Sequence, residues 1–240
     1  MIDGPLAPAM PTTAAVTPEP ASPEPKSEAA SQPGASANLA PYRVLNAGSG
    51  PYAPKKLHST FDGWKEVRLD IDSRVKPDLL GSITNMRSVA SDACFDAIWC
   101  SHNLEHLHAH EVRPALAEFR RVLKPTGFAL ITCPDVEAVA QLVVNGQLEA
   151  TAYTSPQGPI TALDMIYGHG TSIEKGNLFM AHNTAFTAER LGNLLIECGF
   201  HEAWTTKGPA FDLWAVAFMP DADRVLLQKQ LLANDLNFRR

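Results

Sequence analysis

The stretch Arg43-Val-Leu-Asn-Ala-Gly-Ser-Gly50 decides the fold of this chain. Val44 and Leu45 supply apolar, strand-compatible side chains, and Gly48 and Gly50 then let the backbone turn sharply with no Cβ between it and a ligand. A strand that runs straight into a Gly-x-Gly turn is how α/β proteins build a nucleotide site at the carboxyl edge of a parallel sheet. Two glycines after a strand are more often only a tight turn, so the rest of the chain must decide between the two interpretations.

An acidic strand end, Leu69-Asp70-Ile71-Asp72, lies about twenty residues further on. Nucleotide-binding α/β folds place a ribose-binding carboxylate at this distance from the glycine turn. Asp70 is therefore the predicted ribose ligand. Asp72 falls one pleat period later on the same face and is a second candidate, although a solvated turn acid is its simpler interpretation.

Short apolar strands alternate with helical patterns from Tyr42 onward, as a parallel sheet covered by helices requires. The predicted strands after the first are residues 66–70, 78–81, 95–100, 127–133, 200–206 and 211–218. Helices are predicted from about His110 to Leu123, stopped by Pro125, from Thr187 to Cys198, and over residues 221–235. The expected fold class is α/β, with a mostly parallel sheet and helices on both of its faces.

The segment 135–186 fits this alternation poorly. It combines a helical piece, Val136–Val144, with a loop that runs through Tyr167-Gly-His-Gly170. A loop of this length in a compact domain is usually functional or disordered, and its aromatic and histidine content argues against plain disorder. We expect a substrate-binding insertion or lid.

Composition separates the first forty residues from the rest. Residues 1–40 are rich in Ala, Pro, Ser, Thr and Glu and contain no aromatic residue, so a disordered tail is expected there. It lacks the basic start and apolar core of a secretory signal. The predicted organisation is this tail, a catalytic domain over residues 41–220, and a C-terminal helix and tail over residues 221–240.

Charge and cysteine content narrow the class of protein. The chain has 20 basic and 26 acidic residues and a net charge of −6, which gives no electrostatic footprint for nucleic acid. No apolar run is long enough to cross a membrane. The cysteines, Cys94, Cys100, Cys133 and Cys198, are scattered and fit reduced core thiols better than disulfides or a zinc site. A cytoplasmic protein is expected, and the sequence leaves its oligomeric state open.

Five segments follow one another in the order Leu45–Gly50, Asp70, Phe95–Trp99 followed by Leu104-Glu105-His106, Glu118–Gly127, and Phe186–Phe200. Together they resemble the class I S-adenosylmethionine-dependent methyltransferases, especially the methyltransferase type 11 group. The similarity covers roughly residues 42–218 and implies a Rossmann-like fold with S-adenosyl-L-methionine as the cofactor.

The chain departs from this family at four positions. Asn46 stands where the family commonly has an acid, Tyr52 where it has a third glycine, Ser82 where an acid lies near the adenine, and Thr126 in place of the first glycine of its Lys-Pro-Gly-Gly turn. These departures bear on cofactor affinity and catalytic competence rather than on the fold.

The resemblance assigns a set of cofactor contacts. The glycine turn would meet the methionine end, Asp70 the ribose, Ser82 and Ile83 the adenine, and the end of the fourth strand would line the floor of the site. The residues expected to bind the cofactor are Asn46, Ala47, Gly48, Ser49, Gly50, Asp70, Ile71, Ser82, Ile83, Cys100 and Ser101.

Histidines are the candidate catalytic residues. His106 lies in the family signature, His102 lies near the expected methyl position, and His169 and His182 come from the insertion. One of them would serve as general base or hydrogen-bond donor, while loop-orienting histidines are the simpler interpretation of each. The four-residue steps from His102 to His110 suggest a metal face, but Pro114 places the helix start after His106. No metal site is therefore expected.

The predicted activity is transfer of a methyl group to a small-molecule or glycan-like acceptor. A non-catalytic methyltransferase-like binding protein is the first alternative. A nicotinamide-dependent oxidoreductase shares the strand, the glycine turn and the acid, but Pro51 would disrupt a helix start that faces a pyrophosphate. The acceptor atom cannot be read from the sequence.

Overall fold

The computed structural model describes residues 41–53 and 57–238. The predicted tail, residues 1–40, lies outside the described residues, and so do the last two residues of the predicted C-terminal segment. The described residues belong to one compact unit, Ala40–Arg240.

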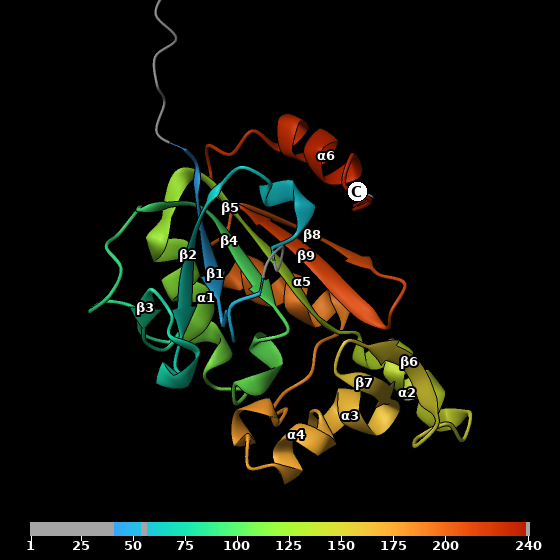
Figure 1. The fold of residues 1–240 in the computed structure, drawn as a ribbon. Helices are drawn as coiled ribbons and strands as arrows, with labels where there is room; N and C mark the ends of the chain where they lie inside the picture. Colours follow the sequence, from blue (N-terminus) through green and yellow to red (C-terminus); the bar gives the residue numbers. More distant parts are fainter. Residues whose placement is uncertain (1–40, 54–56, 239–240) are drawn as a thin grey trace, which may run out of the picture. The chain divides into compact units, whose positions relative to one another are not determined.

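A seven-stranded sheet in the order β3-β2-β1-β4-β5-β9-β8 forms the centre of this unit (Figure 1). Its strands are β1 (Arg43–Ala47), β2 (Lys65–Asp70), β3 (Leu79–Leu80), β4 (Phe95–Ser101), β5 (Leu123–Pro134), β8 (Glu202–Lys207) and β9 (Asp212–Phe218). The first five are parallel to one another, and β9 runs antiparallel to both β5 and β8. The predicted α/β fold with a mostly parallel sheet is confirmed.

The strand order reverses at β1, which pairs in parallel with β2 on one side and β4 on the other. In open α/β sheets, ligands bind outside the carboxyl ends of the strands at such a switch point. The glycine turn follows β1 at this edge, so the sheet topology itself favours it as a ligand site.

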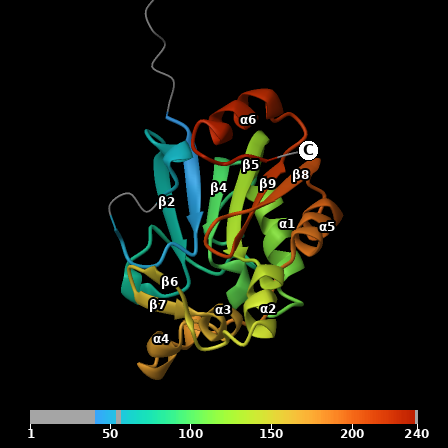
Figure 2. The same ribbon diagram turned by 90° about the vertical axis from the view of Figure 1, so that its right-hand side faces the viewer.

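Helices and aromatic side chains cover the two faces of the sheet. The first face packs against α1 (Val112–Val122) and α5 (Ala188–Glu197), which lie near each other in Figure 2. The second face packs against α6 (Arg224–Leu232) and the short turn η1 (Ser59–Phe61), with Trp99 and Trp204 in the same cluster. Alternating strand side chains feed the two clusters, as the period of a strand requires.

The predicted helices and most of the strands agree with the structure in position. Thr187 caps α5 by accepting a hydrogen bond from the amide of Arg190, and Gly199 leaves that helix at φ +91°. The fifth strand begins earlier than predicted, at Leu123, because its first residues pair with β4 across a register shift near Phe95. The third strand is shorter than predicted.

The segment 135–186 is more regular than predicted. After α2 (Val136–Val144), a two-stranded sheet forms from β6 (Thr151–Ser155) and β7 (Gly158–Thr161). The helices α3 (Ala162–Tyr167) and α4 (Gly170–Glu174) and the turn η4 (Leu178–Met180) follow, so the predicted loop through residues 167–170 is reduced to Gly168 and His169 between two helices. A capping box between Thr161 and Asp164 starts α3, and Val139, Ile160, Ala162 and Met165 form a small core.

The described residues bear on two further predictions, which concern membrane spans and the state of the cysteines. None of the helices described has the length and apolar character needed to span a membrane. All four cysteines are free thiols, with Cys100 and Cys133 buried.

Candidate active site

The glycine turn after β1 uses the backbone conformation that glycine favours. Gly48 has φ +71° and Gly50 φ +57°, in the left-handed region. The amides of Gly48 and Ser49 both donate to the carbonyl oxygen of Leu69, at 2.9 and 3.0 Å. These bonds tie the turn to the end of the neighbouring strand β2, where Asp70 follows.

Asp70 lies directly beside the glycine turn. One carboxylate oxygen accepts the amide of Gly50 at 2.7 Å and the other accepts the amide of Asp72 at 2.9 Å. Each oxygen has a further lone pair, so the carboxylate can still accept a ligand hydroxyl. Ile71 is 53% exposed next to it. Asp72 instead caps the turn that follows and forms an ion pair with Arg74 at 2.8 Å.

The other predicted cofactor residues differ in what they present to a ligand. Asn46 is buried, and its side chain donates to Glu66 at 2.7 Å. Ser82 shares a hydrogen bond with Thr84 at 2.8 Å and remains half-buried. Buried residues occupy four further positions: Ala47, Ser49, Ile83 and Cys100. Ser101 is the last residue of β4 and is partly exposed.

His102 begins the segment that follows β4, and its backbone is strained. Its φ of +48° is unusual for a residue with a Cβ, and such strain clusters at functional sites. Its Nδ1 lies 3.2 Å from Oε1 of Glu105, and 48% of its side chain is exposed. Burial by itself would lower the pKa of His102, but the hydrogen bond and charge of Glu105, together with Asp212, raise it.

Glu105 is a buried acid in the turn η3 (Leu104–His106). The residue is 1% exposed, and its Oε2 has no hydrogen-bond partner within the described part of the chain. Burial would raise the pKa of Glu105, but the hydrogen bond from His102 and the nearby rings of His106 and His182 lower it. The carboxyl group is therefore held as a carboxylate.

Two more histidines meet beside this acid. The rings of His106 and His182 lie edge to face, with 4.8 Å between their centroids. His106 donates through Nδ1 to the carbonyl of Ala181 at 3.0 Å, and His182 donates through Nδ1 to that of Met165 at 2.9 Å. Burial, as the largest cause, lowers the pKa of His182.

His169, the third predicted catalytic histidine, makes its contacts within its own helix cap. Its ring shares a hydrogen bond with Ser172 at 2.8 Å. The structure thus groups His102, His106 and His182 around Glu105, and gives His169 a separate local partner.

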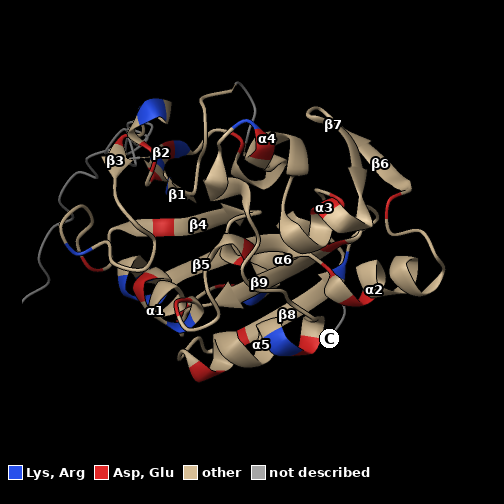
Figure 3. Cartoon of the chain, turned by 90° about the horizontal axis from the view of Figure 1, so that it is seen from below, with Lys and Arg blue, Asp and Glu red and all other residues tan. Residues whose placement is uncertain are grey.

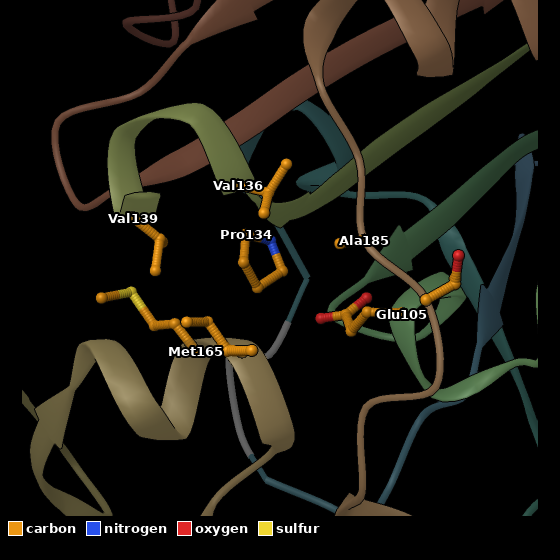
Figure 4. A pocket seen from close by; sticks show the side chains of 8 residues that line it. Glu105, Pro134, Val136, Val139, Met165 and Ala185 are labelled. Carbon is orange, nitrogen blue, oxygen red and sulfur yellow. The ribbon is translucent and has the colours of Figure 1, made fainter. Parts of the chain in front are cut away.

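A small pocket, partly open to solvent, lies between η3, the end of β5 and the insertion (Figure 4); its cavity volume is about 20 Å³. Its walls are mostly apolar, and the Glu105 carboxylate is the charged group among them. The lining residues are Glu105, Pro134, Val136, Val139, Met165, Ile166, Thr184 and Ala185. An apolar pocket with few polar groups at the carboxyl edge of the sheet is typical of a small-ligand site.

The surroundings of this edge carry mixed charge. Figure 3 shows acidic residues on α2 and α3 and both signs on α1 and α5. Among the described residues, these helices therefore do not gather Lys and Arg alone, as a nucleic-acid backbone would require.

Two contributors to this site, Asn103 and Glu105, are not among the site residues predicted from the sequence. Asn103 packs against the glycine turn so closely that a Cβ at Gly48 would overlap its side chain. Glu105 was part of a quoted motif, but nothing in the sequence shows that its carboxylate is buried beside three histidines. The available signal was an acid next to a histidine between two leucines, in Leu104-Glu105-His106-Leu107.

Residues 60–131 match the sequence family described as methyltransferase domain. This segment extends from η1 through the first part of β5 and includes Asp70, Glu105 and the Glu118–Gly127 turn. No curated protein sequence matches the chain significantly.

Among solved structures, the chain is similar to a 1,6-didemethyltoxoflavin-N1-methyltransferase from Burkholderia thailandensis, solved with its substrate and S-adenosylhomocysteine. The identity is 17%, the match covers 75% of this chain and 72% of that one, and the TM-score is 0.48. It is also similar to an S-adenosylmethionine-dependent methyltransferase from Archaeoglobus fulgidus. The identity is 14%, the match covers 74% of this chain and 86% of that one, and the TM-score is 0.49.

Proposed function

We propose that this chain is a class I S-adenosylmethionine-dependent methyltransferase that methylates a small-molecule or glycan-like acceptor. The family match over residues 60–131 and the order of the sheet support the proposal. The observation that carries the proposal is the juxtaposition of two features at one sheet edge. The glycine turn and Asp70 lie at the ends of β1 and β2, and the apolar pocket lies beyond the ends of β4 and β5.

The residues of the glycine turn and Asp70 fit the cofactor. S-adenosylmethionine, when bound, supplies a methyl group activated on a sulfonium. Gly48 and Gly50 allow close approach of the backbone to its methionine end, and Asp70 has free lone pairs for the ribose hydroxyls. Ile71 and Ser82 remain proposed neighbours of the nucleoside. Asn46 would act indirectly, because its side chain is engaged by Glu66.

The pocket under the insertion is the proposed acceptor site. The segments of residues 135–144 and 162–185 build its walls, which supports a substrate-binding role for the insertion. Methyl transfer needs an aligned nucleophile and exclusion of water more than any single catalytic group. The largely apolar walls of the pocket support the exclusion of water.

His102 is the proposed general base among the three predicted histidines. Glu105 orients its Nδ1, which leaves Nε2 able to accept a proton, and about half of its side chain is accessible. His106 and His169 remain candidates for positioning the acceptor. Replacing His102 with Ala would leave cofactor binding intact and reduce turnover.

Calorimetric titration with S-adenosylmethionine, S-adenosylhomocysteine and NAD tests the cofactor. We expect the wild type to bind the first two and not NAD. Asp70→Asn should weaken S-adenosylmethionine about 10–100-fold, since a hydrogen bond to a charged group contributes about 1.5–3 kcal/mol. Asp72→Asn is the matched control and should bind normally. Tight NAD binding alone would overturn the proposal.

The acceptor is tested by release of S-adenosylhomocysteine over a panel of phenols, amines and saccharides. Turnover with one class supports the enzyme and names its acceptor. Cofactor binding without turnover on any of them would favour the non-catalytic alternative.

A further inference from the structure

Three potential metal ligands from two distant segments converge next to the pocket. Glu105 and His106 come from η3, and His182 comes from the end of the insertion. One ligand atom from each lies within 4.8 Å of the other two. The amide of Asn183 donates to the carbonyl of Glu105 at 2.8 Å, and its side chain donates to that of His106 at 2.8 Å, so the two segments are held together.

The hydrogen bonds of the two rings fix which nitrogen is available. In both His106 and His182, Nδ1 lies about 3 Å from a backbone carbonyl oxygen, of Ala181 and Met165 respectively. A carbonyl oxygen can only accept, so Nδ1 carries the hydrogen, and Nε2 of the neutral ring keeps its lone pair. Metal-binding histidines almost always donate their other ring N–H in this way.

Glu105 supplies an independent sign of a ligand. Its Oε2 is buried and has no hydrogen-bond partner in the part of the chain described, while Oε1 is held by the ring of His102. A buried carboxylate oxygen left unpaired is costly, and each such atom in a native structure requires an explanation. A cation between this oxygen and the two imidazoles would satisfy all three groups.

We propose that Glu105, His106 and His182 bind one divalent transition-metal ion of the zinc type. Two imidazoles and a carboxylate suit such ions better than Mg²⁺ or Ca²⁺, which prefer oxygen ligands. Three protein ligands leave one coordination position, as in catalytic zinc sites. Glu105 also lines the pocket, so the ion would lie at the pocket wall.

A metal site at these three residues differs from the prediction, made from the sequence, that the protein has no metal site. That expectation considered the run from His102 to His110 and rested on where α1 begins, and the structure confirms that α1 starts only at Val112. The additional ligand, His182, lies outside that run and is brought in by the insertion.

A second histidine pair provides a matched control. His108 and His110 are exposed, and their rings stack with 5.8 Å between centroids. Such a surface pair offers two imidazoles to a transition metal without any built site. It must therefore be distinguished from the three proposed ligands.

The test titrates tag-free, metal-stripped full-length protein with Co²⁺, followed by visible absorption, and with Zn²⁺, followed by calorimetry. We expect one ion per chain and the visible bands of low-coordinate Co²⁺. His106→Ala and His182→Ala should each weaken metal binding by more than about 100-fold. This exceeds the loss of affinity that is typical when only a residue hydrogen-bonded to a metal ligand is replaced. The double variant His108→Ala/His110→Ala should bind as the wild type does.

Circular dichroism checks that the variants fold, and Glu105→Gln and His182→Asn provide conservative replacements that should also lose the metal. Zn²⁺ should raise the melting temperature of the wild type but not that of His182→Ala. The proposal is wrong if the wild type binds no ion. It is equally wrong if binding survives the loss of His106 and His182 but disappears with His108 and His110.

Discussion

Gly48 lies in the turn after β1, where this turn contacts the loop that follows β4. Its φ of +71° disfavours any side chain, and a Cβ there would overlap Asn103, in the loop after β4. A left-handed conformation costs a residue with a Cβ about 1–2 kcal/mol. The glycine is thus required for the approach of two loops as well as for the approach of a ligand.

Gly48→Val should abolish binding of S-adenosylhomocysteine and lower the free energy of unfolding by more than the conformational cost alone. Calorimetry and urea unfolding measure the two effects. Gly146→Val is a matched control, because Gly146 has φ +75° but nothing within 4 Å of the position of a Cβ. That control should be destabilised and still bind. If both variants bind equally well, the turn has no role in cofactor binding.

At this scale the sequence predicted local backbone features better than it predicted side-chain contacts. Gly48 and Asp70 follow from spacing along the chain, because a turn and a strand end are local patterns. The hydrogen bond from Asn46 to Glu66 and the approach of His182 to His106 depend on tertiary packing. No local pattern predicts them.

Among the elements, α1 is tied to the segment before β4 by a largely buried ion pair within the helix. Arg121 donates to both oxygens of Glu118, at 2.7 and 2.8 Å, and also to Asp92. Glu118 accepts the amide of Met86 at 2.6 Å as well. The side-chain hydrogen bond with Arg121 is the main reason that the pKa of Glu118 lies below its usual value.

Glu118→Gln should lower the free energy of unfolding at pH 7 by about 1–3 kcal/mol, because it weakens a buried, charge-assisted network. A lowered pKa in the folded state means that the charged form stabilises the fold above the pKa of the unfolded chain. This contribution is lost as the pH falls through the folded pKa. Urea unfolding from pH 7 down to pH 3 should therefore show the wild type and variant converging. A difference that grows on acidification would contradict this assignment.

The insertion shows why elements outside the main alternation are hard to predict. The helix Val136–Val144 has a clear pattern and was predicted with its exact bounds. The hairpin of β6 and β7 was missed, because its strands are short, half-exposed and interrupted by a register shift. Its stability comes from packing around Val139 and Met165, which are far apart in sequence.

Ala185→Phe tests the insertion as an acceptor site. Ala185 lines the pocket but is itself exposed, so a ring added there would fill the pocket without entering the core. We expect turnover to fall at least tenfold with affinity for S-adenosylmethionine unchanged. The exposed Ala117 on α1 gives a control, Ala117→Phe, that should leave turnover intact. Unchanged turnover in Ala185→Phe would place the acceptor elsewhere.

For the molecule as a whole, two thiols in the central strands report on global unfolding. Cys100 on β4 and Cys133 on β5 are completely buried in the same core cluster, whereas Cys94 and Cys198 are partly exposed. Burial is the largest cause that raises the pKa of Cys100 and of Cys133, and the nearby charge of Glu105 adds to it. Both thiols therefore lack the thiolate form that reacts with alkylating agents.

Iodoacetamide under native conditions should modify Cys94 and Cys198 first and leave Cys100 and Cys133 unreacted, as peptide mass spectrometry would show. With increasing urea, alkylation of the two buried thiols should follow the same transition as circular dichroism, because core groups open only with global unfolding. Cys133 lies one residue from the pocket residue Pro134, so it is the sensitive reporter of the pair. Its alkylation well before the main transition would show that the insertion opens separately from the sheet, and the pocket would then be gated by that motion.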